Sequence, residues 1–342
     1  MLTNQQIDNN RSWLLENGSP PVRFLTHVHL LDSSGPSEEL TRLWREVEAS
    51  EEAETILAAQ QPDGSWCSGN PWAGKPSYVP AAGYSPFTPK FVTAVWVLSV
   101  LGDMGFTIQD SRIRKAAEYV LEYQWPSGLF SRFNVKRVTD DPEAERPSDN
   151  APCELGAYLQ ALGKVGMGMD GRLTKSYDLL MRWQREDGGW ITQAHKEERN
   201  WWRSCPASSH GATMALYCSG RPECREALCR GLEFLVWHLS LKKEAEIRSF
   251  FYHGHNMVKE LVVLSEMGIG LTQPPVQVLL DWLTSMYRPE EAHFSSPGRR
   301  PTQSSQGWLR YSLYHLVEDD WLTYYATRIA VHLRNARPMG GT

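Results

Sequence analysis

Three stretches of this sequence repeat one pattern: Gln60-Gln-Pro-Asp-Gly-Ser-Trp66, Gln124-Trp-Pro-Ser-Gly-Leu-Phe130 and Gln184-Arg-Glu-Asp-Gly-Gly-Trp190. Each has Gln, three residues, Gly, one residue and an aromatic residue, and each follows a run with helical apolar spacing. The glutamines are separated by 64 and then 60 residues. A fixed period of this length indicates stacked copies of one supersecondary unit, none of which buries its apolar face alone.

Helical patterns alternate with loops along the chain, and no period-2 pattern typical of a strand persists. We expect each repeat to pair an outer helix, which ends in the Gln segment, with an inner helix richer in Ala, Gly and Val. The expected outer helices are 4–16, 40–59, 110–124 and 172–184, with decayed copies ending at Leu235-Val-Trp-His238 and Leu283-Thr-Ser-Met286. The expected inner helices are 21–32, 88–102, 150–163, 208–219, 255–267 and 319–335. The sequence therefore predicts six helix pairs.

The repeated pattern resembles the QW motif of the superfamily that contains squalene–hopene cyclases and the β-subunits of protein prenyltransferases. The match covers residues 40–190 well. In that family the Gln and the aromatic residue tie outer helices together, and the helix pairs surround a central pocket. The resemblance implies an all-α protein with a single (α/α)6 toroid over residues 1–342. The N-terminal helix, 4–16, would close the ring against the C-terminal helix, 319–335.

Composition describes a soluble globular protein, with 41% hydrophobic and 22% charged residues among 342. The net charge of −5 provides no general attraction to nucleic acid. The polar start of the chain lacks the layout of a signal peptide, and the longest apolar run, 91–101, is too short to span a bilayer. Six scattered cysteines favour reduced thiols. We therefore expect a cytoplasmic protein without a cofactor.

Fourteen tryptophans exceed ordinary usage. Aromatic rings either fill gaps between helices or line a pocket that stabilises positive charge through cation–π contacts. Together with the resemblance, this predicts an enzyme that cyclises or isomerises an apolar, isoprenoid-like or polycyclic small molecule by acid–base chemistry. Such an enzyme would collect its lipophilic substrate through peripheral contact with a membrane.

The inner helices of such a toroid all start at one rim, and the family's cyclases carry an Asp-x-Asp-Asp acid there. This sequence lacks that motif, so proton transfer falls to other residues of the rim segments His253-Gly-His255-Asn256 and Glu318-Asp319-Asp320. The acidic segment has an alternative interpretation as a helix N-terminal cap. The candidates for proton transfer are His253, His255, Asp319, Asp320 and Asp149. The candidates for substrate contact are Tyr252, Asn256, Trp321, Trp96 and His210.

Other functions remain open. The β-subunits of prenyltransferases hold zinc with Asp-x-Cys and a later His, and the corresponding residues here would be Asp149, Cys153 and His210. Asp149 precedes Cys153 by four residues rather than two, so the sequence favours no bound metal. A hydrolase or lyase of a sugar or another polar substrate would use paired rim carboxylates. A non-catalytic binding protein would have kept the fold and lost the acid.

Overall fold

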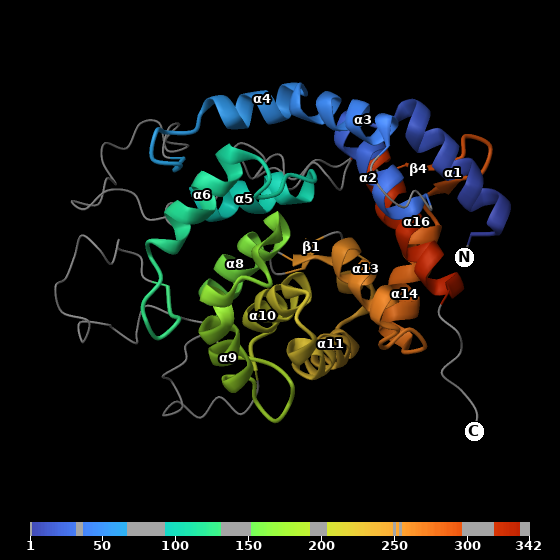
Figure 1. The fold of residues 1–342 in the computed structure, drawn as a ribbon. Coiled ribbons are helices and arrows are strands. Elements are labelled where there is room, and N and C mark those ends of the chain that lie inside the picture. Colours follow the sequence, from blue (N-terminus) through green and yellow to red (C-terminus); the bar gives the residue numbers. More distant parts are fainter. Residues whose placement is uncertain are drawn as a thin grey trace, which may run out of the picture. The chain divides into compact units, whose positions relative to one another are not determined.

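The protein is all-α, as Figure 1 shows. The computed structural model describes residues 2–31, 37–66, 93–130, 152–191, 204–248, 251–252, 255–295 and 318–335. The α-helices are α1 (Asn4–Asn17), α2 (Pro20–Leu30), α3 (Glu38–Glu48), α4 (Glu51–Ala58), α5 (Ala94–Asp103), α6 (Ser111–Leu121), α8 (Pro152–Leu162), α9 (Thr174–Arg182), α10 (Pro206–Ser219), α11 (Arg225–Ser240), α12 (Glu244–Ile247), α13 (Met257–Met267), α14 (Pro274–Thr284) and α16 (Asp319–Asn335). Short 3₁₀ turns precede α9 and α11, and a π-helical turn, η3 (Gly163–Met167), follows α8.

The described strands form two antiparallel hairpins of two-residue strands. β1 (Phe251–Tyr252) pairs with β2 (His255–Asn256), and β3 (Tyr287–Arg288) pairs with β4 (His293–Phe294). The first hairpin corrects an expectation, because the inner helix predicted to start at residue 255 begins at Met257. A second correction concerns the outer helix predicted over 40–59, which is divided into α3 and α4 by a break at Ala49 and Ser50.

Helix starts follow from local chemistry. The side chains of Thr3, Ser37 and Asp110 accept backbone N–H bonds at the starts of α1, α3 and α6. Such caps satisfy N–H groups that have no partner within the helix. Proline occupies the first turn of α2, α10 and α14, where its missing N–H costs nothing. These signals are local, and for that reason the helices predicted over 110–124, 172–184 and 319–335 lie within a few residues of those observed.

The chain divides into two compact units. The middle unit holds residues 55–235, and the terminal unit holds residues 1–54 together with the described residues from 236 onward. The closed six-pair ring over residues 1–342 stays a prediction.

In the middle unit, each repeat glutamine bridges to the next outer helix. Its Nε2 donates to a backbone carbonyl near the start of that helix. The pairs are Gln60–Arg112 at 2.9 Å, Gln124–Arg172 at 2.9 Å and Gln184–Ala227 at 2.8 Å. The predicted bridges of Gln124 and Gln184 are thus confirmed, and each amide joins two repeats distant in sequence.

The aromatic residue of two of these turns is a buried tryptophan that hydrogen-bonds to the preceding outer helix. The indole Nε1 of Trp66 donates to the Ile56 carbonyl, and that of Trp190 to the Leu180 carbonyl, both at 2.7 Å. Both tryptophans are fully buried. Each satisfies a carbonyl at the end of its own outer helix while contributing a large apolar surface to the core. Phe130 lacks that donor and instead stacks on Tyr158, with ring centroids 4.5 Å apart.

The repeat glycines allow the backbone of each turn to lie close to the backbone of the next outer helix. Gly64, Gly128 and Gly188 have φ of +94°, +97° and +84°, a region that L side chains rarely adopt. A Cβ at Gly188 would also lie 2.4 Å from the Arg230 carbonyl oxygen on α11. Glycine is therefore required both by the turn and by the neighbouring backbone.

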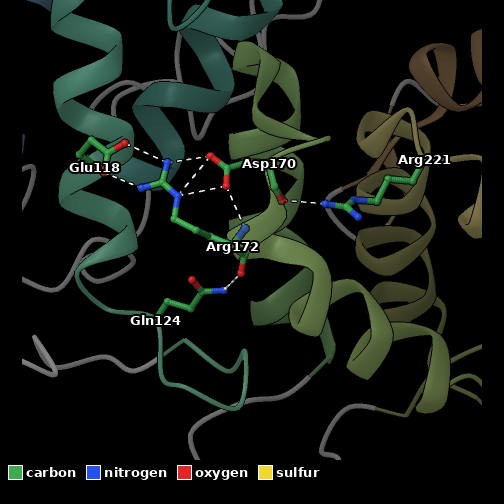
Figure 2. A network of polar contacts seen from close by, with 5 residues as sticks. All are labelled: Glu118, Gln124, Asp170, Arg172 and Arg221. Carbon is green, nitrogen blue, oxygen red and sulfur yellow. Dashed lines mark hydrogen bonds and ion pairs between the residues drawn. The ribbon is translucent and has the colours of Figure 1, made fainter.

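A polar network in the middle unit links three successive repeats (Figure 2). The Arg172 guanidinium donates to both oxygens of Glu118 on α6, at 2.8 and 3.0 Å, and also pairs with Asp170. The hydrogen bond from Arg172 lowers the pKa of Asp170. The Arg172 carbonyl accepts from Gln124, and the Asp170 carbonyl accepts from Arg221 at 2.7 Å. The turn before α9 is thus fixed from both sides.

The inner helices α8 and α10 lie side by side and run parallel. A Cβ at Gly156 would lie 2.7 Å from the carbonyl carbon of Gly211, and one at Gly163 2.6 Å from the Cys218 carbonyl oxygen. The contacts advance along both helices in the same direction, from Gly156 and Gly211 to Gly163 and Cys218. The two helices are therefore parallel, with their N-termini at the same end. Glycine at the contact brings the two backbones together.

In the terminal unit, α16 packs against α1, α2 and α13. The buried amide of Asn10 on α1 and the hydroxyl of Thr327 are 3.1 Å apart. Contacts with α13 pair Lys259 with Tyr325 and Ser265 with His332, so α13 and α16 are parallel. The helix predicted over 319–335 has these bounds in the structure.

The β3–β4 turn resembles the repeat turns at its aromatic residue. Ala292 has φ +56° and precedes the buried Phe294 by two residues, as each repeat glycine precedes its aromatic residue. The Phe294 N–H donates to Thr323 Oγ1 at 2.9 Å, as the Trp190 N–H donates to Ser209 Oγ at 2.9 Å. The decayed copy predicted at Met286 thus has a turn that is two residues longer, because Ala292 follows Met286 by six residues whereas each repeat glycine follows its glutamine by four.

Replacing Gln184 with Ala should lower the free energy of unfolding by about 1–3 kcal/mol, because two buried carbonyl partners lose their donor. Urea unfolding followed by circular dichroism measures this loss. The exposed Gln5, changed to Ala, is the control and should have a small effect. An unchanged midpoint in Gln184→Ala would contradict the bridging role.

Glycine and alanine should have opposite effects at equivalent turns. Gly188→Ala should destabilise the protein by more than about 1–2 kcal/mol, the cost of a left-handed conformation, because the new Cβ also meets the Arg230 carbonyl. Ala292→Gly should stabilise it by up to about 1 kcal/mol, because that strain is relieved. Thermal unfolding of both variants tests the pair. Destabilisation by Ala292→Gly would disprove the equivalence.

Candidate functional site

The two aspartates at the start of α16 have different partners. Asp320 is buried, and its carboxylate accepts the backbone N–H groups of Ser19 at 2.8 Å and Trp321 at 2.7 Å. It therefore ties the start of α2 to the start of α16, in agreement with the cap interpretation. The Asp319 carboxylate lies 3.6 Å from His293 Nε2 and 3.4 Å from Ser295 Oγ.

His293 is a polar residue that the sequence analysis missed. Its ring stacks on Trp13 of α1, with centroids 4.6 Å apart. Nδ1 lies 3.2 Å from the Glu291 carbonyl, which can only accept, so this nitrogen carries the hydrogen. Nε2 then faces the carboxylates of Asp319 and Glu291, at 3.6 and 3.7 Å. These distances are longer than a hydrogen bond, so proton exchange between the imidazole and the Asp319 carboxylate requires a closer approach or a bridging water.

The repeat pattern of the sequence does not reveal His293, because its turn has Ala292 where the repeats have glycine. His293 occupies the position between the positive-φ residue and the aromatic residue of the β3–β4 turn. The other copies have Ser65, Leu129 and Gly189 there. The turn itself has no need of an imidazole at that position.

One face of α16 gathers aromatic and cationic side chains. Residues 321, 324, 325, 328 and 332 recur at helical spacing and so share a side of the helix. Trp321 and Tyr325 stack with centroids 5.9 Å apart, and Tyr324 meets Tyr325 at 5.1 Å. Lys259 Nζ lies 5.6 Å from the Tyr325 ring centroid. Trp321, a predicted substrate contact, is buried within this cluster.

In the middle unit, His210 lies in the second turn of α10, and Cys153 begins α8. The backbone of Cys153 comes within 3.8 Å of the position that a Cβ on Gly211 would take, so the two residues are at one level. Desolvation, with the charge of Lys164, lowers the pKa of His210 to about 3. The imidazole is therefore neutral at physiological pH. Trp96 is half-buried on α5.

The remaining candidates have less structural support. His253 and Asp149 lie outside the described residues. Tyr252, His255 and Asn256 are described by their backbone, which forms the β1–β2 hairpin with Tyr252 paired to His255. Asp319 was expected to orient His253 or His255, and its described histidine partner is His293.

The arrangement of possible metal ligands and the length and polarity of the helices bear on the other functions. Within residues 2–335, apart from the gaps given above, no three His, Cys, Asp or Glu side chains are arranged to hold a metal ion. The zinc alternative stays a prediction, because Asp149 lies in one of those gaps. In the same part of the chain, every helix is too short or too polar to cross a bilayer.

Comparison with known proteins gives structural neighbours. No family model matches the chain, and no curated protein matches it in sequence. A protein from Actinoplanes is 16% identical, with a TM-score of 0.41, over 97% of this chain and 98% of its own. The type II terpene cyclase MstE from Scytonema, without ligand, is 14% identical, with a TM-score of 0.42, over 98% and 99%. An MstE variant in complex with merosterolic acid A is 15% identical, with a TM-score of 0.41, over 96% of each chain.

The lowered pKa of His210 makes its contribution to stability depend on pH. The unfolded chain takes up a proton near pH 6.5, whereas the folded protein resists it down to about pH 3. The stability that His210 contributes is thus present above pH 6.5 and is lost progressively as the pH falls toward 3. As the pH falls from 7 to 5, the unfolding free energy of the wild type should decrease more than that of His210→Gln.

Urea unfolding at both pH values measures this difference. His27→Gln, at a half-buried histidine on α2, is the control. A difference that is constant between pH 7 and 5 would contradict the neutral state of His210.

Proposed function

We propose that the protein is an enzyme that cyclises or isomerises an apolar, isoprenoid-like or polycyclic small molecule through a cationic intermediate. The proposal rests on the resemblance of the repeats and on the chemistry of α16. A terpenoid cyclase-like protein needs an apolar surface for its substrate, aromatic rings for positive charge and a group that delivers a proton.

The observation that carries the proposal is the aromatic face of α16. Its three rings lie in contact with one another, and the cations of Lys259 and Arg328 already lie within 6 Å of two of them. Each ring that faces a cation contributes roughly 0.5–2 kcal/mol. A carbocation formed along this face would gain the same kind of stabilisation from the rings.

Proton transfer would fall to Asp319, paired with His293. The carboxylic acid of Asp319 would protonate an alkene. Nε2 of His293 would then accept the C–H proton released at the end of the reaction and pass it to the Asp319 carboxylate, which restores the acid. His253 and His255, before α13, remain candidates for the same task. Asp320 is a weaker candidate, because its oxygens already accept two backbone N–H groups. Asp149 and the neutral His210 are the next candidates for proton transfer.

The reaction conserves atoms. The alkene π electrons bond to the proton of the acid, which leaves a carboxylate and a carbocation. The π electrons of a second alkene then form a carbon–carbon bond to that cation. Loss of a C–H proton to a base ends the sequence. The product has the mass of the substrate and one carbon–carbon double bond fewer for each ring formed.

Purified protein should convert a linear polyprenoid, such as squalene or geranylgeraniol, into an isomer of equal mass, detected by gas chromatography with mass spectrometry. Asp319→Asn and His293→Gln should each lower turnover by about 10²–10⁴-fold, the contribution of a positioned acid or base. Tyr325→Leu should lower it by about 2- to 30-fold, and the matched Tyr325→Phe should keep most of the rate.

Retention of more than about a tenth of the wild-type rate in both acid–base variants would exclude this pair. Binding of the polyprenoid without any conversion would favour the non-catalytic alternative.

A further inference from the structure

The inner helices of the middle unit carry polar residues on a side that the core leaves open. α8 contacts both α5 and α10 and lies between them (Figure 1). One side of α8 is fully buried and holds Leu155, Leu159 and Leu162. The half-buried residues of this segment recur at helical spacing and so share another side; they are Cys153, Ala157, Gln160 and Lys164. We call this the open side of α8.

The neighbouring inner helices have the same organisation. The half-buried residues Trp96, Ser99 and Asp103 share one side of α5, and Ala207, His210 and Tyr217 share one side of α10. The open sides of α5 and α8 adjoin, because Lys164, at the end of α8, contacts both Ser99 and Asp103.

Four residues of these two open sides form what we call the polar quartet: Ser99, Asp103, Gln160 and Lys164. The Lys164 ammonium donates to Ser99 Oγ at 3.0 Å and pairs with the Asp103 carboxylate at 2.9 Å. The side chains of Lys164 and Asp103 are only 15% and 12% exposed. Taking two charges out of water is repaid only where further hydrogen bonds satisfy them, and apolar residues of similar size often stabilise a core better. Core packing alone therefore does not account for this pair.

The polar quartet also has hydrogen-bonding capacity to spare. An ammonium has three donors, and within the part of the chain that the structure describes Lys164 uses two of them. The Ser99 hydroxyl accepts from Lys164, and its own hydrogen has no acceptor among the described residues. The Gln160 amide, one turn from Lys164, has no hydrogen-bond partner there either. Donors from three side chains and one amide oxygen are thus left for a ligand.

His210 indicates that the open sides face an enclosed space. Desolvation is the main cause of its low pKa, followed by the charge of Lys164, so protein surrounds the imidazole and the ammonium is close enough to act on it. The residue nevertheless keeps accessible surface. A residue with both properties faces a space within the protein rather than the outer surface.

We infer that the polar quartet binds the oxygen of an uncharged hydroxyl or carbonyl group on a small molecule. Lys164 and Ser99 would donate to that oxygen, and the Gln160 amide would accept from a hydroxyl or donate to a carbonyl. Asp103 balances the charge of Lys164, so an anionic ligand gains no net attraction, and a cationic one would meet mainly donors. Trp96, on the open side of α5, offers an apolar surface to the carbon skeleton. This site belongs to the middle unit, and the inference goes beyond the proposed function without depending on it.

Nuclear magnetic resonance titration of ¹⁵N-labelled protein at pH 7 tests the inference. The probes are cyclohexanol, cyclohexanone, cyclohexanecarboxylate and cyclohexylamine, which share a ring and differ in the polar group. Cyclohexanol or cyclohexanone should shift the side-chain amide resonance of Gln160, which is assigned by its loss in Gln160→Leu. The carboxylate and the amine should bind about fivefold or more weakly, and the tighter of the two uncharged probes identifies the oxygen group.

Variants separate a binding role from a structural one. Gln160→Leu leaves the ion pair intact and should weaken binding of the uncharged probes about 2- to 10-fold, the contribution of one hydrogen bond, measured from backbone amide shifts. The double variant Lys164→Met/Asp103→Leu removes both charges together, because removing one would leave the other buried alone. It should abolish the preference for the uncharged probes. Gln109→Leu and Lys115→Met, at exposed positions of the same unit, are the matched controls and should change nothing.

Equal affinity for the four probes, tighter binding of the carboxylate, or no shift of the Gln160 amide with either uncharged probe would each overturn the inference. Unchanged affinity in folded Gln160→Leu would do the same. Thermal unfolding checks the fold of each variant, and Gln160→Leu decides the matter if the double variant does not fold. The readout is binding rather than turnover, so the presence or absence of cyclisation leaves this result unaffected.

Discussion

The side-chain amide at the end of each outer helix is the constraint on which the middle unit depends. Gln60, Gln124 and Gln184 each donate to a carbonyl at the start of the next outer helix. These backbone carbonyls accept the glutamine N–H in addition to any bond within their own helix. Each glutamine bond therefore holds one repeat against the next. The bond forms only because a glycine four residues later turns into a positive-φ conformation and lets the two backbones approach. Stacking, and with it the parallel placement of α8 and α10, follows from this contact.

The β3–β4 turn keeps the buried aromatic residue of a repeat turn, although it is longer than the repeat turns and its positive-φ residue is an alanine. Ala292 tolerates the backbone conformation that glycine prefers, and Phe294 keeps its place in the core. The position between these two residues can hold a side chain that takes part in proton transfer, because the turn does not require a particular residue there. His293 occupies that position and faces Asp319. A structural repeat and a candidate proton-transfer pair therefore share one turn.

The helix α16 combines structural and chemical roles on different sides. Toward α1 and the β3–β4 hairpin it presents Thr323 and Thr327, which hydrogen-bond to Phe294 and Asn10. On another face it carries the aromatic rings, followed by Arg328 and His332. Rings that stabilise positive charge and cations that attract negative charge thus lie in sequence along one helix.

The sequence by itself determined the helical class, the three turns and the bounds of α16, because caps, helical spacing and the repeat period are local properties. It also singled out Asp319. The partner of that aspartate was decided only by tertiary structure, since His293 reaches it through a hairpin that no local pattern announced. Contacts between residues far apart in the chain depend on how helices pack, and packing is set by the whole core.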